Sequence, residues 1–93
     1  MPRILLIHER DNVVVALEPV RQGEKVCCGA GERQLTARSD IPFGHKMSLA
    51  EIPKGAEIRK YGEVIGRATR DIRSGEHVHV SNIESLRGRG DLR

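Results

Sequence analysis

The sequence repeats a short pattern in which glycine stands three residues after one apolar residue and three residues before another. The pattern occupies residues 20–26, 41–47, 52–58 and 72–78. Acidic residues directly precede the last three copies: Asp40, Glu51 and Asp71. Glycine accepts the positive φ that tight turns require, and proline, present in two copies, fixes φ near its turn value. The spacing is irregular, so the pattern excludes a solenoid and predicts one kind of turn that repeatedly feeds a strand.

Short strand candidates lie between these turns, bounded by Gly, Pro, Asn or Asp. We expect strands at residues 3–7, 13–17, 24–28, 33–38, 45–49, 56–61, 64–69 and 76–80. Residues 29–32 predict a hairpin loop and residues 61–63 a tight turn. Ser81 or Asn82 is expected to cap a final helical turn that runs through Leu86. The sequence thus predicts an all-β fold, a compact, curled, barrel-like sheet of short strands with tight Gly and Pro turns.

The chain is short, with 93 residues, and its aromatic residues are Phe43 and Tyr61 alone. Its core must therefore be aliphatic and modest in size. We expect one domain over residues 1–86, followed by a flexible basic tail over residues 87–93. A domain this thin can supply one wall of an active-site cleft more easily than a whole cleft. The sequence therefore predicts a part of a larger enzyme.

Charge and hydropathy exclude several classes of partner. The net charge is +3, and the tail, with three arginines and one aspartate, carries two of these charges. The nearly neutral body lacks the basic face and stacking aromatics of a nucleic-acid-binding protein. The longest apolar runs, residues 4–7 and 13–17, are far shorter than the roughly 20 residues of a membrane span. We therefore expect no nucleic-acid partner, no membrane association and a cytoplasmic protein, with a homo-oligomer left open.

The two cysteines, Cys27 and Cys28, are adjacent. Neighbouring cysteines rarely form a disulfide with each other, because the required geometry strains the peptide. A second pair, as in a structural zinc site, is lacking. We interpret them as two small residues in a strand, with a reactive vicinal thiol as the alternative.

Histidines and lysines gather at the ends of the expected strands. His77 and His79 are two residues apart, so their side chains share one face of a strand, while Val78 and Val80 face the core. Such a pair could bind a metal or an anionic substrate, although a solvated polar face is the simpler interpretation. His45 and Lys46 follow the Gly44 turn, and Lys60 and Tyr61 precede Gly62 in the next tight turn; β scaffolds often present ligand-binding groups at such positions. We expect these residues to converge on one patch: His45, Lys46, Lys60, Tyr61, His77 and His79.

From residue 8 to about residue 82, the chain resembles the small SAF-type, or β-clip, domain of the altronate/galactarate dehydratase family, and it is similar to sulfolactate sulfo-lyase small subunits. The motifs that carry the resemblance are His8-x-x-Asp11-Asn12-Val13-x-Val15-Ala16-Leu17, Ile41-Pro42-x-Gly44-His45-Lys46, Lys60-Tyr61-Gly62, Ile65-Gly66 and Gly75-Glu76-His77-Val78-His79. The family often continues this last motif with a third histidine, where Ser81 stands here, while Asn82 is retained.

The resemblance implies a β-elimination, in which water or sulfite leaves a 2-hydroxy acid. It implies the small subunit of a sugar-acid dehydratase, acting on a substrate such as altronate with a separate large catalytic subunit. The catalytic candidates are His45, Lys46, Lys60 and Tyr61; the substrate-binding candidates are His77, His79 and Asn82. By family analogy the assembled enzyme would use a divalent metal, iron or manganese, with ligands unknown, and no cofactor is expected in the isolated chain. A non-catalytic module that binds small acids and a structural assembly domain remain the alternatives.

Overall fold

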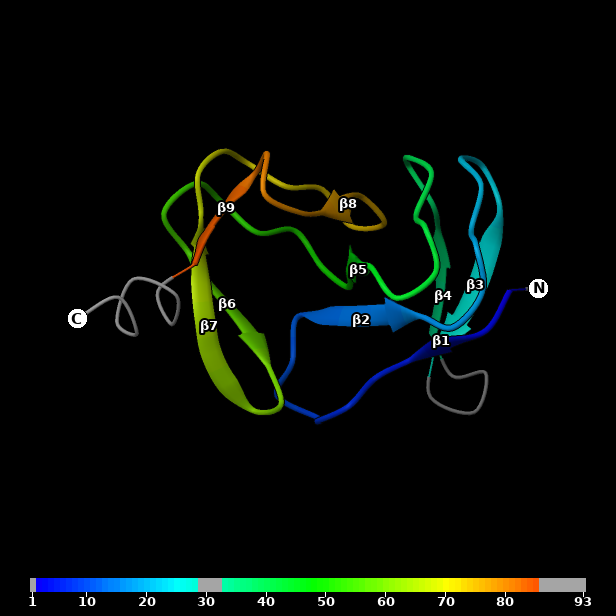
Figure 1. Ribbon diagram of the computed structural model, residues 1–93, viewed down its shortest axis with the longest axis horizontal. Coiled ribbons are helices and arrows are strands. Elements are labelled where there is room, and N and C mark those ends of the chain that lie inside the picture. The colour runs from blue at the N-terminus through cyan, green and yellow to red at the C-terminus, as the bar shows by residue number, and fades with distance from the viewer. Residues whose placement is uncertain (1, 29–32, 86–93) are drawn as a thin grey trace.

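The computed structural model describes residues 2–28 and 33–85 of the chain, and every regular element in this part is a β-strand (Figure 1). The strands are β1 (Ile4–Leu5), β2 (Val13–Ala16), β3 (Lys25–Cys28), β4 (Arg33–Thr36), β5 (Lys46–Ser48), β6 (Glu57–Lys60), β7 (Glu63–Ala68), β8 (His77–Val78) and β9 (Ile83–Ser85). The all-β prediction is confirmed, and each of the eight predicted strands overlaps an observed one. The hairpin loop predicted at residues 29–32 and the tail over residues 87–93 lie outside the described residues.

Three antiparallel sheets build the domain. A central sheet has the order β1-β2-β5-β8, the hairpin β3-β4 lies at one end of it, and the sheet β6-β7-β9 lies at the other end (Figure 1). The described strands do not close into a barrel, because the strands are short and glycine turns interrupt them. The structure therefore has three small sheets where we predicted one curled, barrel-like sheet.

The central sheet lies between two hydrophobic cores, because neighbouring residues on a strand point to opposite faces. Val14 of β2 and Met47 of β5 belong to a first core, shared with residues from the β3-β4 hairpin. Val13 of β2 and Val78 of β8 belong to a second core, shared with residues from β6 and β7. All four side chains are at most 1% exposed, so β2, β5 and β8 are anchored from one or both sides.

The four glycine turns predicted from the sequence share one conformation. Their glycines have φ between 83° and 91°: Gly23, Gly44, Gly55 and Gly75. In each turn the residue after the glycine donates its N–H to the carbonyl oxygen two residues before the glycine, at 2.9–3.0 Å. This hydrogen bond, together with positive φ at the third position, is typical of a type II β-turn. The predicted turns are confirmed.

These turns work in pairs. The segments that lead into the first two turns are joined by two backbone hydrogen bonds between Val20 and Ile41, and both side chains lie in the first core. The last two turns are joined in the same way through Ile52 and Ile72, in the second core. Each core is therefore closed by one pair of turns.

The acidic residues before the turns stabilise a neighbouring turn. The Asp40 carboxylate accepts a hydrogen bond from the backbone N–H of Gln22 at 2.8 Å, and Asp71 accepts one from Lys54 at the same distance. A backbone N–H exposed at a turn gains a charged acceptor in this way. The acidic residues thus tie each turn to its partner.

Two expectations at the C-terminal end were wrong. Residues 83–85 form β9 instead of a helical turn, and they pair with β7 through Gly66. A side chain at residue 66 would lie 2.6 Å from the carbonyl oxygen of Glu84, so the glycine allows the two strands to approach. Val80 is 79% exposed instead of facing the core, because β8 ends at Val78 and the chain turns away. Within the described residues there is no helix that could span a membrane.

The turn glycines differ in the space around them, which allows a matched test. A Cβ at Gly55 meets nothing within 4 Å, whereas one at Gly75 would overlap the carbonyl oxygen of Thr36. We expect Gly55→Ala to lower the free energy of unfolding by about 1–2 kcal/mol through the left-handed backbone alone. Gly75→Ala should lower it by about 3 kcal/mol or more, because the clash adds to this strain. Urea denaturation measures both values, and equal losses would contradict the tight packing at Gly75.

Candidate functional site

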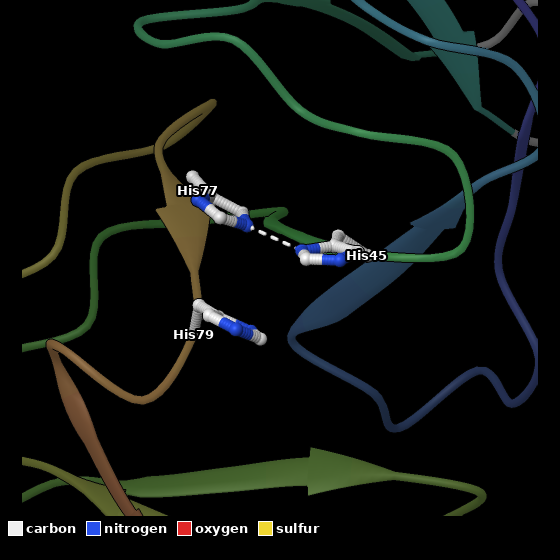
Figure 2. A group of neighbouring side chains, drawn as sticks. All are labelled: His45, His77 and His79. Carbon is white, nitrogen blue, oxygen red and sulfur yellow. Dashed lines mark hydrogen bonds between the residues drawn. The ribbon is translucent and has the colours of Figure 1, made fainter.

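Three histidines form a cluster at the edge of the central sheet. His45 directly precedes β5, His77 begins β8, and His79 follows β8. Their ring centroids lie 4.6–5.2 Å apart, and Nδ1 of His45 lies 2.9 Å from Nε2 of His77, within hydrogen-bond distance. Figure 2 shows the three rings turned toward one another across the gap between the two chain segments. The predicted pairing of His77 with His79 on one face is confirmed, and His45 joins them.

The backbone holds all three histidines in place. β5 and β8 are antiparallel neighbours, with Met47 opposite His77, and Val78 anchors β8 in the second core. His45 donates its N–H to the carbonyl oxygen of Pro42 at 3.0 Å and accepts a bond from the N–H of Ala16 at 2.9 Å. The cluster therefore lies on rigid elements, although the residues come from distant parts of the sequence.

Asn82 is a buried residue beneath the cluster. It is 1% exposed, its amide oxygen accepts from the N–H of His79 at 2.9 Å, and its amide nitrogen donates to the carbonyl oxygen of His77 at 2.7 Å. In this structure the side chain thus fixes the backbone on both sides of Val78. The direct substrate contact predicted for Asn82 stays a prediction.

Lys46 and Lys60 form a second group of cations, and the charge of Lys46 reaches His77. Lys46 lies opposite Val78 in the register of the sheet, so its side chain starts on the face opposite that of His77. Burial lowers the pKa of Lys46, and the positive charge of Lys60 lowers it further. Nζ of Lys60 lies 5.1 Å from the ring centroid of Tyr61, as in a cation–π contact. The convergence of all six predicted residues on one patch therefore stays a prediction. The structure has two subgroups of them: the three histidines, and Lys46 with Lys60 and Tyr61.

Burial and charge also act on His77. Burial lowers its pKa, and the positive charges of His45, His79 and Lys46 lower it further. The influence of Lys46 indicates that the two subgroups lie near enough for their charges to interact. Neutral imidazole is the form that binds metals or accepts a proton. The environment of His77 thus favours the chemically useful form.

Asp11 positions the Lys60-Tyr61-Gly62 turn, and the sequence analysis did not assign it this role. Asp11 is 4% exposed and accepts backbone N–H bonds from His8, Tyr61 and Gly62 at 2.8–3.1 Å. Tyr61 and Gly62 both have positive φ, at 60° and 74°, as in a type I′ hairpin, and this is an uncommon conformation for tyrosine. The family-like motif contained Asp11, but two of its three partners, Tyr61 and Gly62, lie about 50 residues away, where local sequence gives no signal.

The three histidines of the cluster are partly exposed to solvent. Two hollows among the described residues have volumes of about 490 and 280 Å³, and neither includes a predicted site residue. Of the large hydrophobic residues that are exposed, Phe43, Tyr61 and Val80 lie within two positions of His45, Lys60 and His79 in the sequence.

Known proteins match nearly the whole chain. Residues 2–86 match the family described as the altronate/galactarate dehydratase SAF domain. The altronate dehydratase of Escherichia coli (strain K12) is 45% identical over 76 residues, covering 82% of this chain and 15% of the relative. The altronate dehydratase of Bacillus subtilis (strain 168) is 39% identical over 85 residues, covering 91% and 17%. This chain therefore spans about a sixth of each altronate dehydratase.

A smaller relative matches over nearly its whole length. The (2R)-sulfolactate sulfo-lyase subunit alpha of Chromohalobacter salexigens is 32% identical over 88 residues, which cover 88% of this chain and 94% of the relative. The same kind of domain thus occurs within a long dehydratase and as most of a short subunit.

The hydrogen bonds of Asp11 predict a large loss of stability on its removal. Asp11→Ala leaves the N–H groups of His8, Tyr61 and Gly62 without their acceptor, so we expect the free energy of unfolding to fall by about 3 kcal/mol. Asp40→Ala is the matched control, because it removes an exposed bond to Gln22, and should cost about 1 kcal/mol. Urea denaturation of both variants measures the difference. A similar cost for the two would mean that Asp11 does not hold the hairpin.

The lowered pKa of His77 predicts a loss of stability in mild acid. Above the ordinary value of 6.5, His77 is neutral in both the folded and the unfolded chain. As the pH falls below 6.5, the unfolded chain takes up this proton first, so folding loses stability. We expect a lower free energy of unfolding at pH 5.5 than at pH 7.5, with a smaller difference in His77→Gln. The same pH dependence in the variant would assign the effect to other groups.

Proposed function

Because this chain belongs to the family of altronate/galactarate dehydratase SAF domains, we propose that it is the small subunit of a sugar-acid dehydratase. The enzyme eliminates water from a 2,3-dihydroxy acid such as altronate. The small subunit acts together with a separate large catalytic subunit. The match to nearly all of a sulfo-lyase subunit alpha supports the subunit arrangement, and the altronate dehydratases support the reaction class.

The observation that carries this proposal is the cluster of His45, His77 and His79, with Lys46 near enough for its charge to act on His77. A β-elimination needs a base for the weakly acidic proton next to the carboxylate, an acid for the leaving hydroxyl, and positive charge near the developing enediolate. Neutral imidazole can act as the base, and ammonium groups can attract the carboxylate and stabilise negative charge. We assign His45, Lys46, Lys60 and Tyr61 to the chemistry, and His77, His79 and Asn82 to holding the substrate.

The reaction conserves atoms without an oxidant or a reductant. The C2 proton goes to the base and the C3 hydroxyl leaves as water after protonation. The enol that remains becomes a 2-keto-3-deoxy acid. In the assembled enzyme a divalent metal, iron or manganese by family analogy, would supply an electrophile for the substrate oxygens. The partial exposure of the three histidines supports a partner that covers the substrate and excludes water.

A second candidate is a non-catalytic module that binds small acids. The partial exposure of the histidine cluster favours it, because a small acid can reach the three rings without a partner subunit. Equilibrium binding of sugar acids to the isolated chain distinguishes the two proposals. Tight binding without a catalytic partner favours the module, whereas binding that requires the large subunit favours the dehydratase.

The dehydratase proposal is tested by co-expressing the chain with large subunits of this enzyme class and assaying altronate, galactarate and sulfolactate. We expect the isolated chain to be inactive and the complex to be active. His79→Ala should reduce turnover of the complex by at least about 100-fold with an unchanged melting temperature, because the side chain is half-buried and outside the core. Lys54→Gln is the control, since Lys54 is exposed and outside the cluster.

Two results would contradict this proposal. Turnover of a sugar acid by the isolated chain would remove the need for a large subunit. Full activity of the His79→Ala complex would reduce the histidine cluster to a structural feature.

A further inference from the structure

We propose that His45, His77 and His79 form a three-nitrogen site that binds one divalent transition-metal ion in this chain itself. The open side of the ion would take the carboxylate and hydroxyl oxygens of a 2-hydroxy acid. This inference deepens the proposed function, because it gives that substrate a binding point, but metal binding can be tested without a large subunit. It departs from the expectation of no cofactor in the isolated chain, and the geometry of the cluster is the reason.

The ligand atoms already lie near the positions that a metal requires. One nitrogen from each histidine can be chosen so that all three lie within 4.8 Å of one another, and the shortest measured pair is 2.9 Å apart. Two imidazole nitrogens bound at about 2.1 Å to one tetrahedral ion lie about 3.4 Å apart. The 2.9 Å pair lies below this value, and the 4.8 Å limit for the set lies above it. Small side-chain rotations therefore suffice to form the site, and the rings already face one another (Figure 2).

The hydrogen bond between His45 and His77 does not explain the whole cluster. That bond accounts for the approach of two rings. His79 nonetheless stacks against both, with centroids 4.6 Å from His45 and 5.2 Å from His77. Three cationic imidazoles this close would repel one another, whereas a metal holds three neutral imidazoles together. A shared ion gives one reason for all three positions.

Hydrogen bonds already fix the backbone of each ligand, so little further ordering is needed to form this site. The N–H of His77 donates to Oγ of Ser39 at 2.9 Å, and the N–H of His79 donates to the amide of Asn82 at the same distance. These bonds restrict the backbone segments that carry the two rings, so less conformational freedom is lost when the metal binds. Asn82 is thus a positioning residue for two of the three ligands.

The donor set selects the class of metal. Imidazole suits zinc, iron, nickel and copper, whereas magnesium and calcium prefer oxygen ligands. Three protein ligands leave at least one coordination position open, as in catalytic zinc sites. The register places the start of the Lys46 side chain on the other face of the sheet, away from the ion. Lys46 therefore does not occupy the metal position.

The experiment titrates Co²⁺ into the full chain after removal of any affinity tag and treatment with a chelator. We expect one ion per chain by calorimetry, visible absorption bands of nitrogen-bound Co²⁺, their loss on addition of Zn²⁺, and a higher melting temperature with metal. His45→Ala and His79→Ala should each weaken Co²⁺ binding by at least about 100-fold. His8→Gln is the matched control and should bind as tightly as the unaltered chain.

Two kinds of result would overturn the inference. One is a lack of stoichiometric Co²⁺ and Zn²⁺ binding by the unaltered chain. The other is binding that survives in both His45→Ala and His79→Ala, or that is lost equally in His8→Gln. Circular dichroism of each variant separates loss of the site from loss of the fold, and a folded His79→Ala alone suffices for the comparison. A complex active with a chain that binds no metal would overturn this inference alone, whereas an inactive complex with metal bound would overturn the proposed dehydratase alone.

Discussion

The structure depends on four glycines that adopt a backbone conformation disfavoured for other residues. Each type II turn reverses the chain within four residues, and two such turns meet through paired backbone hydrogen bonds at Val20 and Ile41, and again at Ile52 and Ile72. Each pair closes one core, and the central sheet lies between the cores. One of these turns, at Gly44, delivers His45 to β5, and another, at Gly75, delivers His77 to β8. The constraint that closes the cores thus also positions the site.

The sequence predicted the elements that local residues determine. The glycine turns and the strands that follow them were predicted because positive φ and alternating apolar residues are local properties. The C-terminal strand was not predicted, because Ser81 and Asn82 looked like a helix cap, whereas the real determinant is Gly66, which lets β9 approach β7. Val80 was misplaced for a related reason: alternation holds only while the strand continues, and nothing local showed that β8 is so short.

Local sequence likewise predicted only part of the candidate site. Strand alternation placed His77 beside His79, but the arrival of His45 depends on the pairing of β5 with β8, across 32 residues of sequence. The register of that pairing also places the side chain of Lys46 on the face opposite that of His77. The sequence placed both residues only at the ends of strands, and this does not show which face each side chain takes. Asp11 illustrates the same limit, because its role rests on backbone N–H groups about 50 residues away.

The central sheet has a consequence for how the domain melts. β2 places Val13 in one core and Val14 in the other, and β5 and β8 are hydrogen-bonded to each other while they contribute Met47 and Val78 to opposite cores. Neither core can lose its packing while the strands shared with the other stay ordered. The two halves are therefore expected to unfold as a single cooperative unit, despite three separate sheets. The histidines lie in or directly beside β5 and β8, so the cluster keeps its arrangement only while this shared sheet stays folded.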